Sequence, residues 1–201
     1  MTKVKNAFYA QSGGVTAVIN ASACGVIETV NKSKKIHKVL AGENGILGAL
    51  NEELIDTSKE TKSNIAKLKQ TPGGAFGSCR FKLQDPIKQK REYERLFEVF
   101  AAHDIEYFFY NGGGDSQDTT FKVSEMAKKL KFPLKCVGIP KTVDNDLGDQ
   151  SFKKMYFNPG FASCVTIWKF FLEMINLENI GAQSHDKVII SQTFGRDTGF
   201  I

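Results

Sequence analysis

Cysteine and histidine are scarce in this chain, and neither forms a metal-binding or disulfide pattern. The 201 residues include 4 cysteines and 3 histidines. The cysteines lie far apart and form no Cys-x-x-Cys pair, which argues against a zinc site and against a disulfide framework. This cysteine usage is typical of proteins in a reducing cytoplasm, so we expect a cytoplasmic location.

Long hydrophobic runs are also lacking. The chain reaches the polar segment Gln11–Gly14 soon after its first residue, which leaves no room for the hydrophobic region of a signal peptide. No apolar run approaches the roughly 20 residues that a membrane-spanning helix needs. The sequence therefore predicts a soluble protein with no membrane partner.

The composition is that of a globular protein whose charge balance suits anionic small molecules as well as nucleic acid. Hydrophobic residues make up 41% of the chain, enough for a buried core, and the net charge is +5. Basic residues are scattered among acidic ones, apart from a short cluster at Lys32, Lys34 and Lys35. We interpret that cluster as a solvated surface and predict no nucleic-acid partner.

Strands and helices are predicted to alternate along the chain. Strands are expected at residues 7–10, 38–41, 105–110, 134–138 and 187–191, and helices at residues 15–30, 58–68, 89–103, 117–130 and 161–177. In the helix over 89–103, the spacing of Tyr93, Leu96, Phe97 and Phe100 indicates a core-facing side. This alternation predicts the α/β class, with a doubly wound, mostly parallel sheet covered by helices on both faces.

Glycine-rich loops follow several of these strands. Gly13 and Gly14 fit either a tight turn without a ligand or an anion site at the start of a helix. The loop 71–80 ends in Arg80, which is either solvated or able to grip phosphate oxygens. The segment Gly112–Ser116 could cap a helix, but three consecutive glycines favour close approach of the backbone to a phosphate.

The segment from Val137 to Gly148 holds the densest group of polar side chains. Lys141, Thr142, Asp144 and Asp146 lie there without the apolar spacing of a core segment. Because ligands bind at the carboxyl ends of parallel strands, this loop and the glycine-rich loops are expected to converge on one edge of the sheet. We predict that the loop performs phosphoryl transfer.

Three motifs taken together resemble those of the phosphofructokinases: Gly112–Ser116, residues 139–147 and residues 194–199. The resemblance covers nearly the whole chain in the right order. It implies a phosphofructokinase-like fold, with a donor-phosphate domain carrying the catalytic loop over residues 1–154. Residues 155–201 would begin a sugar-phosphate domain that is incomplete, since the chain ends where a further helix would begin.

The resemblance also implies roles for individual residues. Asp144 would be the general base at the sugar 1-hydroxyl, and Asp146, with Asp115 as a second candidate, would hold Mg²⁺. Lys141 and Thr142 complete the catalytic set. The implied donor-phosphate residues are Gly13, Gly14, Arg80, Gly113, Gly114, Asp115 and Ser116. The implied substrate-binding residues are Thr142, Val143, Asp144, Lys187, Phe194, Gly195 and Arg196. Lys187 takes the place of a residue that reaches a neighbouring subunit, which implies a homo-oligomer, a dimer or tetramer.

Two residues point to the phosphoryl donor. Where ATP-using members of the family have glycine, this chain has Asp115, whose side chain would repel the inner phosphate of a nucleotide. Lys141 could stabilise the departing phosphate without a nucleotide. The expected reaction is therefore a reversible glycolytic transfer from pyrophosphate to fructose 6-phosphate.

The chain also departs from the family pattern. Gly114 replaces an aspartate expected to bind magnesium, and Phe194 replaces a methionine. The C-terminal half that would supply further sugar contacts is absent, so we expect activity from a complete assembly rather than from these residues alone. The alternatives are an ATP-dependent phosphofructokinase, a lipid or dinucleotide kinase, and a non-catalytic phosphate-binding subunit of the same fold.

Overall fold

The structure is a computed structural model that describes residues 4–148, 151, 155–196 and 198–201. The chain divides into two compact units, Met1–Lys141 and Thr142–Ile201, and each is described by itself below.

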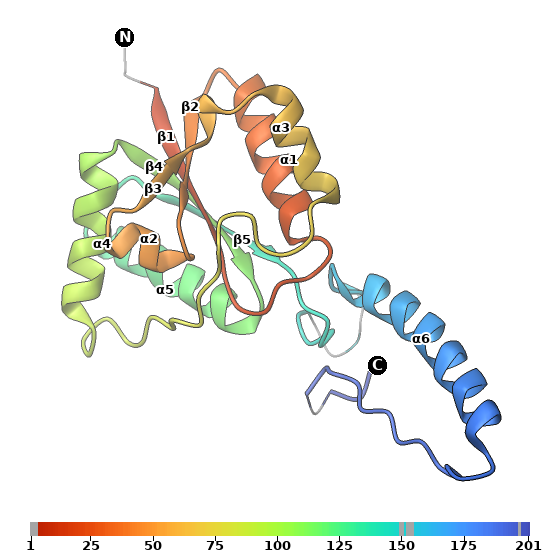
Figure 1. The fold of residues 1–201 in the computed structure, drawn as a ribbon. Helices are drawn as coiled ribbons and strands as arrows, with labels where there is room; N and C mark the ends of the chain where they lie inside the picture. Colours follow the sequence, from red (N-terminus) through yellow and green to blue (C-terminus); the bar gives the residue numbers. More distant parts are fainter. Residues whose placement is uncertain (1–3, 149–150, 152–154, 197) are drawn as a thin grey trace. The chain divides into compact units, whose positions relative to one another are not determined.

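A five-stranded sheet forms the centre of the first unit (Figure 1), in the order β3-β2-β1-β4-β5. The strands are β1 (Lys5–Gln11), β2 (Ile36–Gly42), β3 (Leu54–Asp56), β4 (Ile105–Gly112) and β5 (Lys135–Pro140). β1 lies parallel to β2 and β4, and β4 lies parallel to β5. Only β3, at the edge, pairs antiparallel with its neighbour β2. The predicted α/β class with a mostly parallel sheet is confirmed.

Helices cover both faces of this sheet. They are α1 (Ile19–Lys32), α2 (Ile46–Leu50), α3 (Lys62–Lys67), α4 (Lys90–Ala102) and α5 (Gly114–Lys129), with the short 3-10 helices η1 (Thr57–Lys59) and η2 (Leu68–Gln70). α1 buries Ile19, Ala23, Ile27 and Val30, whose spacing places them on one side of an α-helix. Because the apolar residues gather on that side, the helix packs this side on the sheet while the other side faces solvent.

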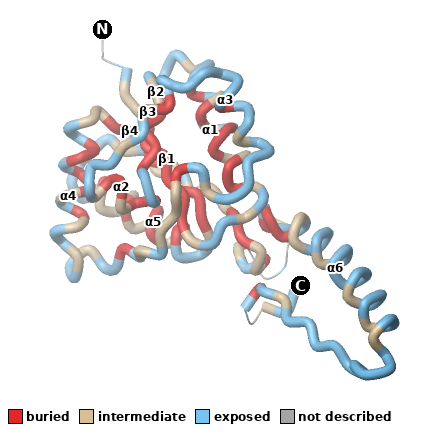
Figure 2. The backbone as a smooth tube through the Cα atoms, in the orientation of Figure 1, coloured by how far each residue is buried: buried red, intermediate tan, exposed pale blue. Residues whose placement is uncertain are grey.

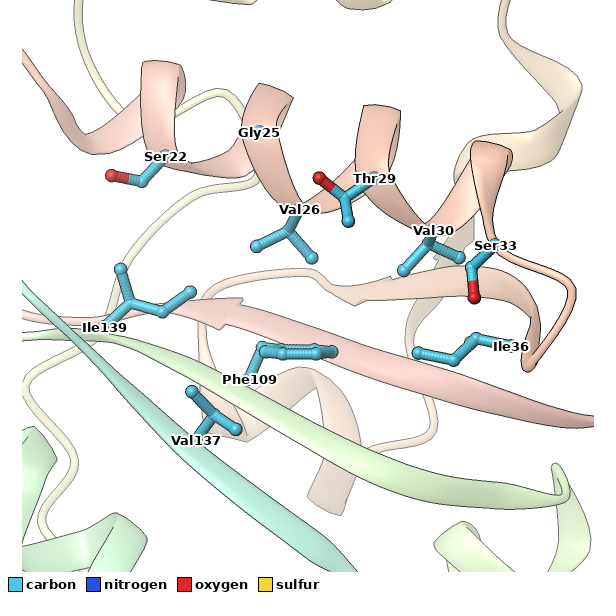
Figure 3. A pocket seen from close by; sticks show the side chains of 10 residues that line it. All are labelled: Ser22, Gly25, Val26, Thr29, Val30, Ser33, Ile36, Phe109, Val137 and Ile139. Carbon is cyan, nitrogen blue, oxygen red and sulfur yellow. The ribbon is translucent and has the colours of Figure 1, made fainter.

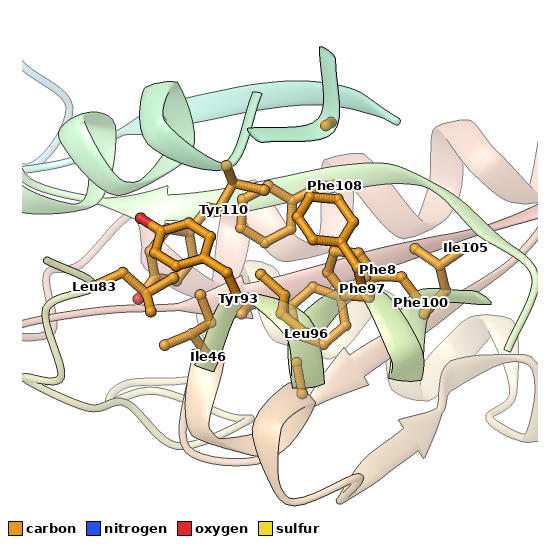
Figure 4. Close-up of a cluster of buried hydrophobic side chains, with 14 of the residues drawn as sticks. Phe8, Ile46, Leu83, Tyr93, Leu96, Phe97, Phe100, Ile105, Phe108 and Tyr110 are labelled. Carbon is orange, nitrogen blue, oxygen red and sulfur yellow. The ribbon is translucent and has the colours of Figure 1, made fainter. Parts of the chain in front are cut away.

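The side chains of β1 alternate between two cores. Phe8 and Ala10 belong to a cluster with α2, α4 and α5, and Ala7 and Tyr9 belong to a cluster with α1 and α3. All four are fully buried, as expected for a central strand covered on both faces. Figure 4 shows the first cluster, in which the ring of Phe8 stacks on that of Phe108 with centroids 5.8 Å apart. The core positions predicted on α4 are all buried in this cluster: Tyr93, Leu96, Phe97 and Phe100.

The second unit contains one long helix, α6 (Phe161–Ala182), which extends beyond the predicted end at residue 177. Among its described residues only Phe161 is buried, and Figure 2 shows exposed or intermediate positions along the rest of the helix. Large apolar side chains such as Phe170 and Leu177 are 58% and 69% exposed. No helix in the described part of the chain is long and apolar enough to cross a membrane.

The strand predicted at residues 187–191 is wrong. This segment is irregular, and Val188 and Ile190 are 75% and 91% exposed. A strand needs a neighbour to satisfy its backbone hydrogen bonds. In the described part of the second unit, no strand lies beside this segment, so its β-branched residues do not form one.

Other predicted elements change in extent. The helix predicted over residues 58–68 is divided into η1, α3 and η2, because Glu60 and Thr61 are extended. α1 begins at Ile19 rather than at residue 15, and α5 begins at Gly114, three residues before the predicted start at residue 117. β3 and α2, both short, were not predicted.

Candidate functional site

The carboxyl ends of β1, β4 and β5 meet at one edge of the sheet in the first unit. These three strands are parallel neighbours, so their carboxyl ends lie together. The backbone N–H of Ser12 donates to the carbonyl of Asn111 at 2.9 Å, and that of Lys141 donates to the carbonyl of Gly112 at 3.1 Å. Within the first unit, the ends of β1 and β4 and Lys141, the residue after β5, therefore lie together, and the rest of the catalytic loop belongs to the second unit.

The loop that carries Arg80 is bound to the first glycine loop. The N–H of Gly13 donates to the carbonyl of Cys79 at 2.9 Å, and the hydroxyl of Ser78 donates to the carbonyl of Gly13 at 2.6 Å. A Cβ atom placed on Gly14 would lie 3.7 Å from Nη2 of Arg80, so the guanidinium lies beside that glycine. These contacts bring a fixed positive charge to the end of β1.

Lys141 brings a second positive charge to the same place. Its side chain is only 4% exposed, and its ammonium group donates to the carbonyl of Gly14. A Cβ atom on Gly13 would lie 3.3 Å from Nζ of Lys141. A buried ammonium group is costly unless polar partners or an anion surround it. Together with Arg80, it makes the Gly13–Gly14 loop a setting for a negatively charged ligand.

The N-terminus of α5 adds backbone donors. Gly113 is the N-cap residue, and Gly114, Asp115 and Ser116 form the start of the first turn. The first N–H groups of a helix lack partners within the helix and carry the positive end of its dipole, which favours anions. Ser116 is 4% exposed, and its Oγ lies 2.0 Å from the point where a Cβ of Gly112 would stand, so only glycine fits at residue 112.

Asp115 is the one carboxylate predicted among these donor-phosphate residues. It is paired with Lys82, a residue that sequence reasoning did not select: Nζ of Lys82 lies 2.6 Å from Oδ1 of Asp115. The hydrogen bond and charge of Asp115 raise the pKa of Lys82. The only signal in the sequence was the position of Lys82, two residues after Arg80 on the same loop.

In the second unit, the loop with the predicted catalytic carboxylates is held by two asparagines. Asn145 has a left-handed backbone (φ 55°), and its Oδ1 accepts the N–H of Asn158 at 2.8 Å. The side chain of Asn158 bonds both the N–H and the carbonyl of Leu147, at 2.7 and 2.8 Å. Oγ1 of Thr142 accepts the N–H of Asp144 at 3.0 Å, which leaves the hydroxyl proton of Thr142 able to donate elsewhere.

Arg196 lies against the two predicted catalytic carboxylates. Its Nε donates to Oδ2 of Asp144 at 2.8 Å, and its Nη2 donates to Oδ2 of Asp146 at 3.0 Å. The side chains of Asp144 and Asp146 are 16% and 28% exposed, so both carboxylates are only partly accessible. One guanidinium between two carboxylates offsets the repulsion between them.

The other predicted substrate-binding residues do not share this cluster. Lys187 is exposed, and Phe194 packs its ring on Trp168 with centroids 5.8 Å apart. Gly195 is buried and has φ 117°, a conformation that an L side chain rarely adopts. Val143 lies within the catalytic loop and is half-buried.

The donors suited to a metal ion are carboxylates. No group of three or more His, Cys, Asp or Glu side chains that could hold a metal ion occurs among residues 4–148, 151, 155–196 and 198–201. Magnesium usually keeps several waters and takes one or two protein carboxylates together with phosphates of the substrate. The carboxylates of Asp146 and Asp115 both fit that donor chemistry, and each is paired with a cation, Asp146 with Arg196 and Asp115 with Lys82.

A separate groove on the first unit is apolar. Its volume is about 520 Å³ and it lies between α1 and the sheet (Figure 3). The lining includes Val26, Phe109, Val137 and Ile139, and no predicted site residue lines it. Without charged groups, this groove is unsuited to a phosphate donor.

Comparison with known proteins gives concordant matches. The family model described as phosphofructokinase matches residues 6–201. A protein of Halomonas elongata named pyrophosphate–fructose 6-phosphate 1-phosphotransferase is 54% identical over 201 residues, which covers 98% of this chain and 46% of that protein. A protein of the same name from Xanthomonas campestris is 50% identical over 196 residues, with the same coverage, 98% and 46%.

A solved structure is also similar. The crystal structure of the pyrophosphate-dependent phosphofructokinase of Marinobacter aquaeolei superimposes with a TM-score of 0.76 at 57% identity, over 90% of this chain and 42% of that chain. The present chain thus spans about half the length of the curated relatives that it matches.

Proposed function

Because this chain belongs to the phosphofructokinase family, we propose that the protein containing it transfers a phosphoryl group from pyrophosphate to the 1-hydroxyl of fructose 6-phosphate. The relatives at 54% and 50% identity carry the name of that reaction. The observation that carries the proposal is the arrangement in the first unit, where two cations lie beside Gly13 and Gly14 and α5 begins at the end of the neighbouring strand β4.

The donor would bind in the first unit. Backbone N–H groups at the glycine loops would contact the phosphates, and Arg80 would grip their oxygens with its planar fork. Lys141 would stabilise charge on the phosphate that departs. The full set proposed for the donor is Gly13, Gly14, Arg80, Gly113, Gly114, Asp115 and Ser116. We propose residues 1–154 as the donor domain and residues 155–201 as the start of the sugar-phosphate domain.

Asp144 would act as the general base. Its carboxylate would take the proton of the sugar 1-hydroxyl as the sugar oxygen bonds to phosphorus and the bond to the departing phosphate breaks. The hydroxyl of Thr142 is free to donate to a phosphate oxygen, because its Oγ1 holds the loop only as an acceptor. The sugar phosphate would be bound by Val143, Phe194, Gly195 and Arg196.

Asp146 would hold a magnesium ion. When bound, magnesium neutralises charge on the transferring phosphoryl group. Asp115 remains a second candidate ligand, and each of the two carboxylates already has a cationic partner, Arg196 at Asp146 and Lys82 at Asp115. Arg196 would then have two roles. It would compensate the charges of Asp144 and Asp146, and it would contact the sugar phosphate.

We also propose a cytoplasmic homo-oligomer, in which Lys187 would reach the sugar phosphate of a neighbouring subunit. The exposed position of Lys187 agrees with such a role. Transfer between two phosphate compounds without a nucleotide would make the reaction reversible, as expected for a glycolytic step that can run in both directions.

Turnover by the full-length protein tests the proposal. Fructose 6-phosphate, pyrophosphate and magnesium should give fructose 1,6-bisphosphate, and Asp144→Asn should lower kcat by about 10²- to 10⁴-fold. Glu94→Gln, which changes an exposed carboxylate on α4, serves as the matched control and should keep full activity. An Asp144→Asn protein with near-normal kcat would refute the base assignment.

A non-catalytic phosphate-binding subunit is the second candidate, and Gly114 favours it because this residue replaces a carboxylate expected to bind magnesium. Calorimetric titration of the full-length protein with pyrophosphate, with and without magnesium, separates the two functions. Binding without any turnover would establish the subunit and exclude the enzyme.

A further inference from the structure

The proposed donor site contains a contradiction. Arg80, Lys141 and the N-terminus of α5 favour an anion, whereas Asp115 places a negative charge in the first turn of that helix. An uncompensated carboxylate there would repel every phosphate donor, pyrophosphate included. The inference below rests on the proposed function and concerns how the site tolerates Asp115.

Lys82 compensates this charge. Its ammonium Nζ lies 2.6 Å from Oδ1 of Asp115, a short contact typical of a charge-assisted hydrogen bond. The backbone around Lys82 is tied to the site through the loop of Arg80, whose neighbour Cys79 accepts the N–H of Gly13 at 2.9 Å. The ammonium group is therefore delivered by the same loop that delivers the guanidinium of Arg80.

The next carboxylate along α5, Asp118, is paired with a different lysine. Asp118, one turn further along α5, also contributes to the raised pKa of Lys82. Its Oδ2, however, accepts the ammonium of Lys122 at 2.7 Å. Two acid–lysine pairs thus lie along the start of α5, and only the first involves a residue of the proposed donor site.

We propose that Lys82 is a specificity-determining positioning residue that acts through Asp115. By pairing with the carboxylate, Lys82 cancels the repulsion that Asp115 would exert on pyrophosphate. The bulk of the Asp115 side chain remains at the start of α5, where it would obstruct the inner phosphate of a nucleotide. Lys82 and Asp115 together would admit the smaller donor and exclude the larger one.

A double-mutant cycle in the full-length enzyme tests this inference. Lys82→Ala should raise KM for pyrophosphate by on the order of three- to tenfold, as expected for one unpaired charge near an anion at an intermediate dielectric constant. Its kcat should change little. In an Asp115→Asn background, which removes the charge and keeps the shape, Lys82→Ala should add no further change in KM. Lys82→Arg should retain a low KM, because it keeps the positive charge.

Lys122→Ala is the matched control, since it breaks the second acid–lysine pair at the start of α5, and its KM for pyrophosphate should equal that of the wild type. The effect of Lys82→Ala should shrink in high salt, because both side chains are accessible and their charges are screened.

Three results would overturn the inference. An unchanged KM in Lys82→Ala would make the pair an ordinary surface ion pair. An equal loss in both backgrounds would mean that Lys82 acts on the donor directly. A loss of the same size in Lys122→Ala would point to a general charge effect. Failure of the proposed function is separate, because it would be seen in the unmutated enzyme as absence of turnover with pyrophosphate.

Discussion

The side chain of Asn20 fastens the loop 71–80 to α1, and its removal measures how firmly the loop of Arg80 is held. Asn20 is 1% exposed. Its Nδ2 donates to the carbonyl of Thr71 at 2.9 Å, and its Oδ1 accepts the N–H of Ala75 at 2.9 Å and Nε2 of Gln11 at 3.1 Å. Asn20→Ala would remove all three bonds without disturbing the backbone of the helix.

The expected cost follows from these contacts. Each hydrogen bond contributes about 1 kcal/mol net, so the three together contribute about 3 kcal/mol. Alanine is the better helix former, which returns up to about 0.7 kcal/mol. We therefore expect Asn20→Ala to lower the free energy of unfolding by about 2 to 3 kcal/mol.

Urea unfolding of the variant and the wild type measures this difference. Asn31→Ala is the matched control, since Asn31 is exposed on the same helix and should show only the small propensity gain. Hydrogen exchange gives an independent reading, because the amide of Ala75 should exchange faster in Asn20→Ala. A loss in the free energy of unfolding below about 1 kcal/mol, with unchanged exchange at Ala75, would refute the role of Asn20.

Two further predictions concern stability outside the site. Burial by itself would raise the pKa of Asp56, but hydrogen bonds from Lys38 and Ser58 hold it below its ordinary value. A carboxylate with a lowered pKa stabilises the fold above its unfolded pKa of about 3.9 and loses that contribution as the pH falls through the folded pKa. Asp56→Asn should therefore lower the free energy of unfolding by about 1 to 2 kcal/mol at pH 7 and by almost nothing in strong acid. Urea unfolding as a function of pH measures this difference, and a difference that persisted below about pH 2 would contradict the prediction. Gly48→Ala would place a Cβ 2.4 Å from the backbone N of Glu43. This clash should lower the free energy of unfolding by about 1 to 3 kcal/mol. A variant with wild-type stability would contradict the close packing at Gly48.

The four parallel strands of the sheet could be predicted because buried strands and helix faces follow local periodicity. The spacing of Tyr93 and Phe100 predicts their burial on α4, and both are buried. The loops also follow from topology, since parallel neighbours must bring their carboxyl ends together. The β-branched segment 187–191 shows the limit of local patterns, because strand formation depends on a neighbour that the segment itself cannot specify.

The supports of the candidate site could not be predicted. Asn20 contacts Thr71 and Ala75, which lie far from it in the sequence. Lys82 and Asp115 are also far apart in the sequence, and their side chains are in contact. Such contacts arise only when the loops meet in three dimensions, so no spacing or composition marks these residues. The same is true of Asn158, which holds the loop of Asp144 from a later segment.

Pyrophosphate is the proposed donor, and the ratio of kcat/KM for pyrophosphate to kcat/KM for ATP tests this donor preference. The measurement uses the full-length enzyme at saturating fructose 6-phosphate and magnesium. The side chain of Asp115, which would obstruct the inner phosphate of a nucleotide, predicts a ratio well above one, and this ratio should fall in Asp115→Gly. A wild-type ratio below one would contradict the account.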